Sequence, residues 1–376
     1  MSSKKVLWDI SGAFGDIGLL FPISIALIAQ NGFNPTALFL SAGLFYILSA
    51  WYFKITMPVQ PLKAMSAVAI ATGMSSEIIN TAGIILGFIL IVLALTGLSD
   101  ELGRVFPVPV IRGIQLGLGM MLVRASLGLM GSDIFMAVLV GSILAAGMYL
   151  LKKLPPLLFI LPLGGVIALG EMDLSSLGPV AIAPGLPDPS LFWIAFTMLV
   201  LPQISLTIGN AVVATEATAK QLYRERAGRV TFKSVPLSIG IANIASGLVG
   251  GVPMCHGSGG LTAHSKFGAS GERSGYIIGS TLIVLALFFG TASLSFISAF
   301  PSGILGALLC YVGLQHSMLI KDIQNDFRAV FIAMTVGITG FLTHNLTIGF
   351  LTGIVLHHGM NVLDRMVVPF GVKARE

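Results

Sequence analysis

Long uncharged blocks of apolar residues recur along the whole chain and restrict the folds that it can adopt. They cover, for example, residues 79–98, 134–151, 276–290 and 329–343. About 20 consecutive apolar residues are enough for a helix to cross a lipid bilayer. Of the 376 residues, 55% are hydrophobic and only 10% are charged, whereas soluble domains carry about 25% charged residues. We therefore expect an all-α polytopic protein of the inner (cell) membrane, embedded in the lipid bilayer, with no nucleic acid as a partner.

Apolar blocks, interrupted by glycine, proline and charged residues, divide the chain into about fourteen segments. The third and the tenth are too short and too interrupted to be ordinary membrane spans. The approximate limits are 10–30, 35–53, 57–73, 79–98, 106–124, 134–151, 156–170, 190–217, 235–250, 254–265, 275–290, 302–319, 327–342 and 344–366.

The distribution of charge agrees with this division. If the N-terminus is cytoplasmic, the loops near 31–34, 74–78, 131–133, 171–189 and 291–301 lie outside, and none of them contains Lys or Arg. Most of the basic residues then lie on the cytoplasmic side, as the positive-inside rule requires. The pattern predicts a multi-pass protein with both termini in the cytoplasm.

Two pairs of landmarks indicate an internal repeat. Pro58 in "KITMPVQP" and Pro253 in "VGGVPMCHGSGG" are 195 residues apart, and Phe106 and Phe300 are 194 residues apart. A shared offset predicts two related halves of seven segments each. Because seven is odd, the second half is inverted relative to the first. This 7+7 inverted repeat is typical of secondary transporters, whose substrate site lies between the repeats near the bilayer midplane.

The prolines of the two interrupted segments predict half-helices that begin inside the membrane. A proline in the first turn of a helix loses no hydrogen bond, so we expect helices to start at Pro58–Pro61 and near Pro253. Because the halves are inverted, the two starts should meet at the midplane from opposite sides. Each presents unpaired N–H groups and the positive end of a helix dipole. Two such ends that face one cavity form an anion site.

Polar residues near these starts are candidates for substrate binding. Lys63 is an ionisable group within the bilayer and is a functional hypothesis by default, with snorkelling to an interface as the alternative. Gln203, Thr207 and Asn210 recur at spacings of four and three and should line one helix face, where hydrogen bonding between helices is the alternative. The full set of expected substrate-binding residues is Gln60, Pro61, Lys63, Gln203, Thr207, Asn210, Cys255, His256, Gly257, Ser258, Gly259 and Gly260.

Two acids are candidates for coupling or support of the site. Asp16, in the first segment, could carry a coupling proton, orient a donor or pair with Lys63, and a structural pair or cap is the alternative; Phe14 beside it is expected to support the site. Glu216 and His256 are further candidates for the proton, although the place of Glu216 near the cytoplasmic end favours an interfacial position. His316 lies at the end of its segment and is also expected to be interfacial.

Three stretches resemble the signatures of the molybdate transporter family, a branch related to the sulfate permeases. They are "SGAFGDIGLLFPISIAL", "MPVQPLKAMSAVAIATG" and "GGVPMCHGSGGLTAHSKFGA", and the resemblance covers roughly residues 6–320. It implies molybdate as the substrate, held between the two half-helix starts. Many sulfate permeases end in a cytoplasmic regulatory domain, which we do not expect here because Glu376 follows soon after the last expected span. The resemblance also implies a core formed by 1–98 and 190–290 and a gate formed by 99–189 and 291–376.

The residues by themselves indicate only a small oxyanion, so other substrates are retained as alternatives. Tungstate and sulfate are similar ions, a bicarbonate or chloride carrier is a near alternative, and a nucleobase permease is less favoured because the half-helix starts contain no acid. A hydrolase that uses Ser258 and His264 is disfavoured because six residues along a helix leave side chains roughly 120° apart. We therefore expect no enzyme, and the chain contains no metal or cofactor motif. Protons are the candidate coupling ion, and a homodimer is left open.

Overall fold

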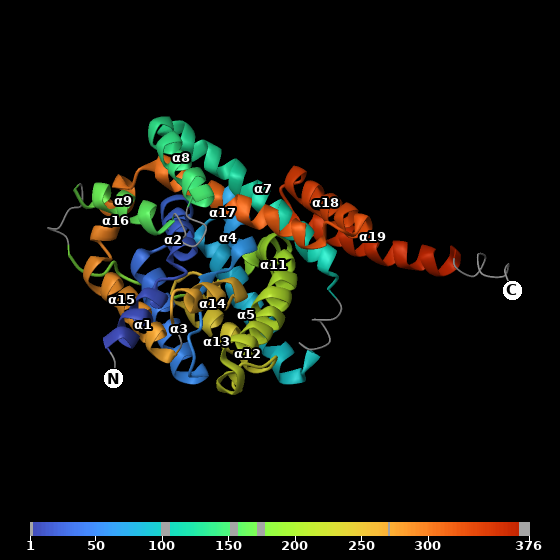
Figure 1. The fold of residues 1–376 in the computed structure, drawn as a ribbon, viewed down its shortest axis with the longest axis horizontal. Helices are drawn as coiled ribbons and strands as arrows, with labels where there is room; N and C mark the ends of the chain where they lie inside the picture. Colours follow the sequence, from blue (N-terminus) through green and yellow to red (C-terminus); the bar gives the residue numbers. More distant parts are fainter. Residues whose placement is uncertain (1–2, 99–105, 151–156, 171–176, 270, 368–376) are drawn as a thin grey trace.

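The computed structural model describes residues 3–98, 106–150, 157–170, 177–269 and 271–367, and it is predominantly helical (Figure 1). The elements are α1 (Ser3–Ala13), α2 (Ile17–Asn31), α3 (Pro35–Phe53), β1 (Gln60–Pro61), α4 (Lys63–Thr72), α5 (Ser76–Thr96), α7 (Val108–Ser132), α8 (Ile134–Leu150), α9 (Leu157–Gly170), η1 (Pro189–Leu191), α10 (Phe192–Ala195), η2 (Phe196–Val200), α11 (Leu201–Leu206), η3 (Thr207–Ala214), α12 (Thr215–Tyr223), η4 (Arg224–Ala227), α13 (Ser234–Leu248), β2 (Met254–Cys255), α14 (Ser258–Lys266), α15 (Glu272–Phe289), α16 (Ala292–Ala299), α17 (Ser302–Ser317), η5 (Met318–Ile323), α18 (Phe327–Leu342) and α19 (Leu346–Val367).

Each of the fourteen predicted ranges contains a helix, which confirms the all-α membrane fold. In the described part of the chain, six helical stretches are long and apolar enough to cross a membrane. They include α3, α5 and α7, and the continuous stretch Pro189–Ala227. The count of fourteen crossings stays a prediction. One short helix, α16, lies in a range that the sequence assigned to a loop.

The first segment, predicted to be one helix over 10–30, is interrupted. Helix α1 ends at Ala13 and α2 begins at Ile17, with Asp16 at the position before α2. The eighth segment is continuous, but Phe196–Val200 and Thr207–Ala214 form π-helices. Ala13 and Thr207 are 194 residues apart, so both halves leave regular α-helix at equivalent places. Irregular turns of this kind are frequent at functional sites.

The starts of the two half-helices were predicted too early. Helix α4 begins at Lys63 and α14 begins at Ser258, after the prolines rather than at them. A residue that precedes proline favours extended backbone, and Gln60–Pro61 accordingly form strand β1. This strand pairs with β2 in antiparallel fashion, so that Gln60 lies opposite Cys255.

The two halves are related in space by the offset that the landmarks predict. Gln60 and Cys255 are 195 residues apart and pair directly with each other. Gly119 of α7 and Gly313 of α17 are 194 residues apart and are also in direct contact, since a Cβ on Gly313 would lie 2.7 Å from the carbonyl oxygen of Gly119. Equivalent positions that contact each other lie on a two-fold axis. The structure therefore confirms the inverted repeat.

Glycines allow two further helix pairs to approach closely. A Cβ on Gly43 of α3 would lie 2.7 Å from the Gly279 carbonyl of α15, and one on Gly87 of α5 would lie 2.7 Å from the Gly240 carbonyl of α13. Small residues at helix contacts are the usual means of close packing in membranes, where burial of apolar surface drives little association. The pairs α3–α15 and α5–α13 are exchanged by the repeat.

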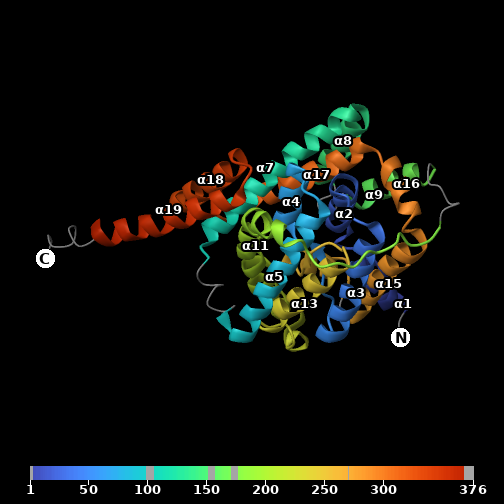
Figure 2. The ribbon, with the colours of Figure 1, turned by 180° about the vertical axis from the view of Figure 1, so that it is seen from behind.

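Helices α7, α8, α17, α18 and α19 lie together along one side of the molecule (Figures 1 and 2). Helix α7 packs against α17, α18 and α19, and the C-terminal end of α19 extends away from the rest. The half-helix α4 packs against α7 and connects this group to the remaining helices.

We expect Gly279→Val to destabilise the fold by about 1–3 kcal/mol, the usual cost of overpacking a well-packed contact. A Cβ at this position would lie 2.8 Å from the Gly43 carbonyl oxygen and 2.7 Å from Cγ1 of Ile47. Thermal unfolding in detergent measures the effect. Gly141→Val is the matched control, because a Cβ there would meet nothing within 4 Å. Equal midpoints for the two variants would contradict this account of the packing.

Candidate anion-binding site

The paired strands hold the starts of α4 and α14 next to each other. The N–H of Leu62, the residue before α4, donates to the carbonyl oxygen of Pro253 at 3.0 Å. The N–H of Met254 donates to Oδ1 of Asn243 at 2.7 Å. Both strands are fully buried. The expectation that the two starts approach each other is therefore met.

Several N–H groups at these starts are available to a ligand. Within the described residues, the N–H groups of Lys63 and Ala64 in α4 and of Ser258, Gly259 and Gly260 in α14 have no hydrogen-bond acceptor. The third N–H of α4 is occupied, because Met65 donates to Oε1 of Gln203 at 3.0 Å. Two positive helix ends with free donors therefore meet at one place, as an anion requires.

Two adjacent cavities, which share lining residues, lie at this junction. The smaller, about 20 Å³, is large enough for one water molecule and is lined by Lys63, Gln115, Gln203, Leu206, Thr207, Asn210, Ala211, Cys255 and His316. The wider, about 420 Å³, is lined by Lys63, Val108, Ile111, Arg112, Gln115, Gly209, Asn210, Ala214, Ser258, Gly259, Gln315, His316 and Leu319. Four residues belong to both: Lys63, Gln115, Asn210 and His316.

The polar stripe of the eighth segment lies on one side of the small cavity. Gln203, Thr207 and Asn210 all line it, and Nε2 of Gln203 donates to the Thr207 hydroxyl at 3.0 Å. The Ser258 hydroxyl donates to Oδ1 of Asn210 at 3.0 Å. This bond ties the start of α14 to the π-helix η3. Gln203 accepts a hydrogen bond from the Met65 N–H of α4, so both half-helix starts are bonded to the same segment.

Asp16 and Gln60 lie behind the junction and line neither cavity. Both side chains are buried, and Nε2 of Gln60 donates to Oδ2 of Asp16. Oε1 of Gln60 is buried without a partner among the described residues. Gly260 provides room for this pair, because a Cβ there would lie 2.7 Å from Oδ2 of Asp16. The glycine therefore allows the approach of a protein carboxylate, although Gly260 was expected to bind the substrate.

The other glycines and Pro61 divide between the two sides of the junction. Gly259 lines the wider cavity, and a Cβ there would meet nothing within 4 Å. Gly257 and Pro61 line neither cavity, and a Cβ on Gly257 would lie 2.7 Å from Oε1 of Gln60. Phe14 is half-buried against the hydrophobic core.

His256 is engaged within the core and lines neither cavity. Its Nδ1 bonds to the carbonyl oxygen of Pro58 at 2.9 Å and its Nε2 to the Ser238 hydroxyl at 3.1 Å. The ring also packs against Phe45 and Phe53. With both ring nitrogens occupied, His256 supports the broken segment and has no nitrogen left for an anion. Glu216 likewise lines neither cavity and pairs with Lys220.

The structure adds residues that the sequence analysis did not place at the site. His316 is buried and lines both cavities, although it was expected to be interfacial. Its Nδ1 donates to the Val312 carbonyl at 2.9 Å, which leaves Nε2 for another partner. Gln115 also lines both cavities and accepts from Arg112 at 2.9 Å. Helix α17 continues into η5, so His316 lies well before the end of this helical stretch, and the predicted end at residue 319 obscured its depth.

The charges around the cavities are positive. Lys63 lines both cavities, and Arg112 lines the wider one while bonding to Asp322 at 2.7 Å. No Asp or Glu is among the described residues that line either cavity. Ser258 and His264 have separate partners, Asn210 and Thr56, so they do not form a nucleophilic dyad. The arrangement can bind an anion and provides no catalytic group pair.

Solved structures of membrane transporters share the fold of this chain. The transmembrane domain of a cyanobacterium bicarbonate transporter, BicA, superposes with a TM-score of 0.69 at 19% identity, over 93% of this chain and 98% of that one. A structure of SLC26A9 gives a TM-score of 0.68 at 14% identity, over 98% and 66%. Murine Slc26a9, an anion transporter in the inward-facing state, also gives 0.68 at 14%, over 100% and 70%. At these identities the likeness shows a shared fold.

The chain belongs to the molybdate transporter family. The family model described as "Molybdate transporter of MFS superfamily" matches residues 9–122 and 195–315, which include both broken segments. Molybdate transporter 2 of Arabidopsis thaliana is 28% identical over 93% of this chain and 86% of its own length. Molybdate transporter 1 of the same plant is 27% identical over 94% and 88%. These relatives are transporters and not enzymes, and the resemblance seen in the sequence is confirmed.

Proposed function

We propose that this protein is a secondary active transporter that carries molybdate across the cell membrane by alternating access. One observation supports the proposal most strongly: the N-termini of α4 and α14 meet beside Lys63 at a cavity that no acidic side chain of the described residues lines. The absence of an acid also disfavours a nucleobase, whose N–H groups need an acceptor. Membership of the family supports molybdate over other oxyanions.

The chemistry of the donors suits a tetrahedral dianion. Such an ion has four acceptor oxygens and must exchange its hydration shell for fixed donors. Peptide N–H groups provide these donors without adding full ionic charges, whose desolvation within a membrane is costly. Lys63 adds one positive charge, and the side-chain amides of Gln115 and Asn210 add further N–H donors.

Alternating access follows from the division of these groups between two sets of helices. Lys63, Asn210 and Ser258 lie on the proposed core (1–98 and 190–290), whereas Gln115 and His316 lie on the proposed gate (99–189 and 291–376). The wider cavity of about 420 Å³ exceeds the size of a single oxyanion. We infer that the gate moves against the core to enclose the anion, as in other inverted-repeat carriers. The positive-inside pattern supports cytoplasmic termini.

Calorimetry on the purified protein tests the substrate assignment. We expect molybdate and tungstate to bind saturably to one site and sulfate to bind more weakly. Chloride at an equal concentration should not compete with molybdate. The two larger ions share charge and shape, so the size of the closed cavity separates them from sulfate. Binding of chloride or bicarbonate in preference to molybdate would favour the alternative anion carriers.

We infer that protons couple to transport through Asp16. This carboxylate is buried, and Gln60 connects it to β1 at the junction of the half-helices. Of the other candidates, Glu216 pairs with Lys220 and His256 has both nitrogens engaged. We expect Asp16→Asn to bind molybdate but to lose uptake driven by a pH gradient in proteoliposomes. Glu216→Gln is the control and should keep that uptake. If the Asp16→Asn variant kept uptake driven by a pH gradient, Asp16 would not carry the coupling proton.

A further inference from the structure

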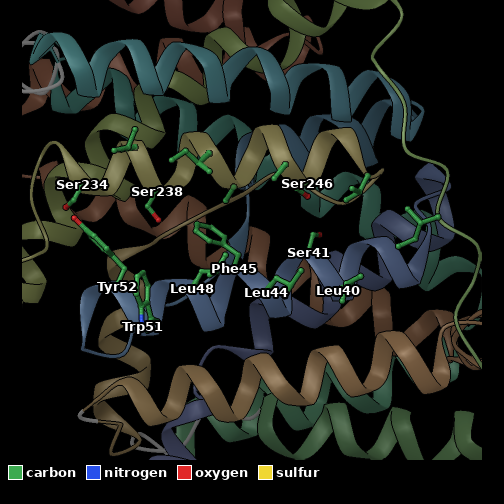
Figure 3. Close-up of a pocket in the computed structure, with 16 residues that line it drawn as sticks. Leu40, Ser41, Leu44, Phe45, Leu48, Trp51, Tyr52, Ser234, Ser238 and Ser246 are labelled. Atoms are coloured by element: carbon green, nitrogen blue, oxygen red, sulfur yellow. The ribbon is translucent and has the colours of Figure 1, made fainter.

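A third cavity, separate from the anion site, lies between α3 and α13 (Figure 3). Its volume is about 450 Å³. Apolar side chains line most of it, from Leu40 to Tyr52 along α3 and from Ser234 to Val249 along α13. Leu48, Trp51 and Ile241 on its rim are 60%, 60% and 56% exposed. The cavity is thus an open apolar groove on the outer surface of the helix bundle.

The four serine hydroxyls that line the groove have internal partners. The hydroxyl of Ser41 donates to Leu38, that of Ser246 donates to Val252, and that of Ser238 bonds to His256. The Ser234 hydroxyl donates to the Arg229 carbonyl at 2.6 Å. The walls of the groove therefore offer little to a polar ligand, and a hydrocarbon chain suits them better.

The two ends of the groove differ. At one end, the segment 177–188 crosses between the helices, where Ile182 lines the groove and the N–H of Gly185 donates to Leu248 at 3.0 Å. At the other end lie Tyr52 and Ser234 (Figure 3). An amphipathic ligand would therefore place its apolar part along the apolar walls of the groove and its polar head at the end where Tyr52 and Ser234 lie.

Two basic residues mark that open end. The Arg229 guanidinium lies 5.9 Å from the centre of the Tyr52 ring, and its NH1 donates to the Tyr52 carbonyl at 2.8 Å. Lys233 is exposed and immediately precedes Ser234. Trp51 and Tyr52 are of the type that gathers at the level of lipid headgroups. Basic residues at the cytoplasmic end of a gap between helices are a setting in which acidic lipid headgroups bind.

We propose that this groove holds one acyl chain of an anionic phospholipid, with the lipid phosphate at Arg229 and Lys233. The twelve-residue rise from Leu40 to Tyr52 corresponds to about 18 Å of helix, and one leaflet of a bilayer core of about 30 Å is about 15 Å deep. The groove therefore accommodates the chain of one leaflet. The positive-inside pattern places the basic end in the cytoplasmic leaflet.

A lipid in this groove would stabilise the junction of the half-helices. Phe45 and Ser238 line the groove and contact the ring of His256, whose Nδ1 bonds to the carbonyl of Pro58. The chain of the lipid would thus hold the side of the core opposite to the anion. This inference does not depend on the identity of the transported ion.

Quenching of Trp51 fluorescence by brominated lipids tests the proposal. The chain has three tryptophans, and Trp8→Phe with Trp193→Phe leaves Trp51 alone. In mixed vesicles we expect brominated phosphatidylglycerol to quench Trp51 with an apparent affinity about 5- to 30-fold above that of brominated phosphatidylcholine, from two basic contacts. Equal quenching by the two lipids would overturn the proposal. Quenching by neither, with cross-linking of two chains through Leu48→Cys, would also overturn it and assign the groove to a second copy.

Two variants separate the chain contact from the head contact. Ala245→Phe fills the groove and should abolish the preference, while Ala145→Phe, on an exposed position of α8, should keep it. Lys233→Gln should reduce the preference several-fold. For the chain with its native tryptophans, phosphatidylglycerol should raise the thermal midpoint more than phosphatidylcholine does, and Ala245→Phe should remove that difference. A preference that survives Ala245→Phe and Lys233→Gln would mean that the lipid binds elsewhere.

Discussion

Replacement of Lys63 by Met is expected to weaken molybdate binding by about 2–4 kcal/mol, or roughly 30- to 700-fold in Kd. Lys63 lines both cavities and is the first residue of α4. A unit charge about 4 Å from another contributes about 4 kcal/mol at an effective dielectric constant near 20, and desolvation of the ammonium offsets part of this. Arg112, the other cation at the cavities, is already bonded to Asp322 and Gln115.

Lys54→Met is the matched control for this experiment. Lys54 is largely exposed and pairs with Glu272 at 3.0 Å, away from both cavities. Its replacement should leave the Kd for molybdate unchanged. Calorimetry on both variants gives the comparison, and thermal unfolding verifies that each is folded. A Kd for Lys63→Met within threefold of the original chain would show that Lys63 does not face the bound anion.

Replacement of Ser258 by Leu is expected to abolish detectable oxyanion binding while the protein stays folded. Ser258 is the first residue of α14, lines the wider cavity and donates to Oδ1 of Asn210 at 3.0 Å. The larger side chain would occupy the space in front of the free N–H groups of α14. It would also leave the Asn210 oxygen without its donor, which adds about 1–3 kcal/mol of cost. Titration with molybdate measures the loss.

Ser258→Ala distinguishes the two causes of that loss. It removes the hydroxyl but leaves the space, so binding should fall only by about 3- to 10-fold, as for one hydrogen bond. Ser142→Leu on the exposed surface of α8 introduces the same side chain away from the cavities and should have no effect. If Ser258→Leu bound molybdate as tightly as Ser258→Ala, the anion could not lie at the start of α14.

The sequence was sufficient to predict the fold because two strong patterns agree. Apolar blocks specify the helices, and the offset of 195 residues between Pro58 and Pro253 specifies the inverted repeat. The break after Ala13 was missed because glycine and a single aspartate within an apolar block do not distinguish a turn from a continuous helix. The helix starts were placed too early because a proline is compatible both with a first helical turn and with the extended strand that it actually enters.

The candidate site was predicted in part. Lys63, Asn210 and Ser258 could be identified because they are polar residues at or near a helix start or on one face of a span. Gln60 and His256 have the same signal, but their partners, Asp16, Pro58 and Ser238, are distant in the sequence. Gln115 and His316 were missed because their contribution depends on how α7 and α17 face the starts of the half-helices. Contacts between distant segments cannot be predicted from the local sequence pattern.

The central claim is that the anion lies between the starts of α4 and α14. Anomalous X-ray diffraction from crystals grown with tungstate locates that heavy atom directly. The account predicts one strong tungsten peak in the cavity lined by Lys63, Asn210, Ser258 and His316, within hydrogen-bond distance of the free N–H groups of both half-helices. A peak elsewhere, with this cavity empty at saturating tungstate, would contradict it.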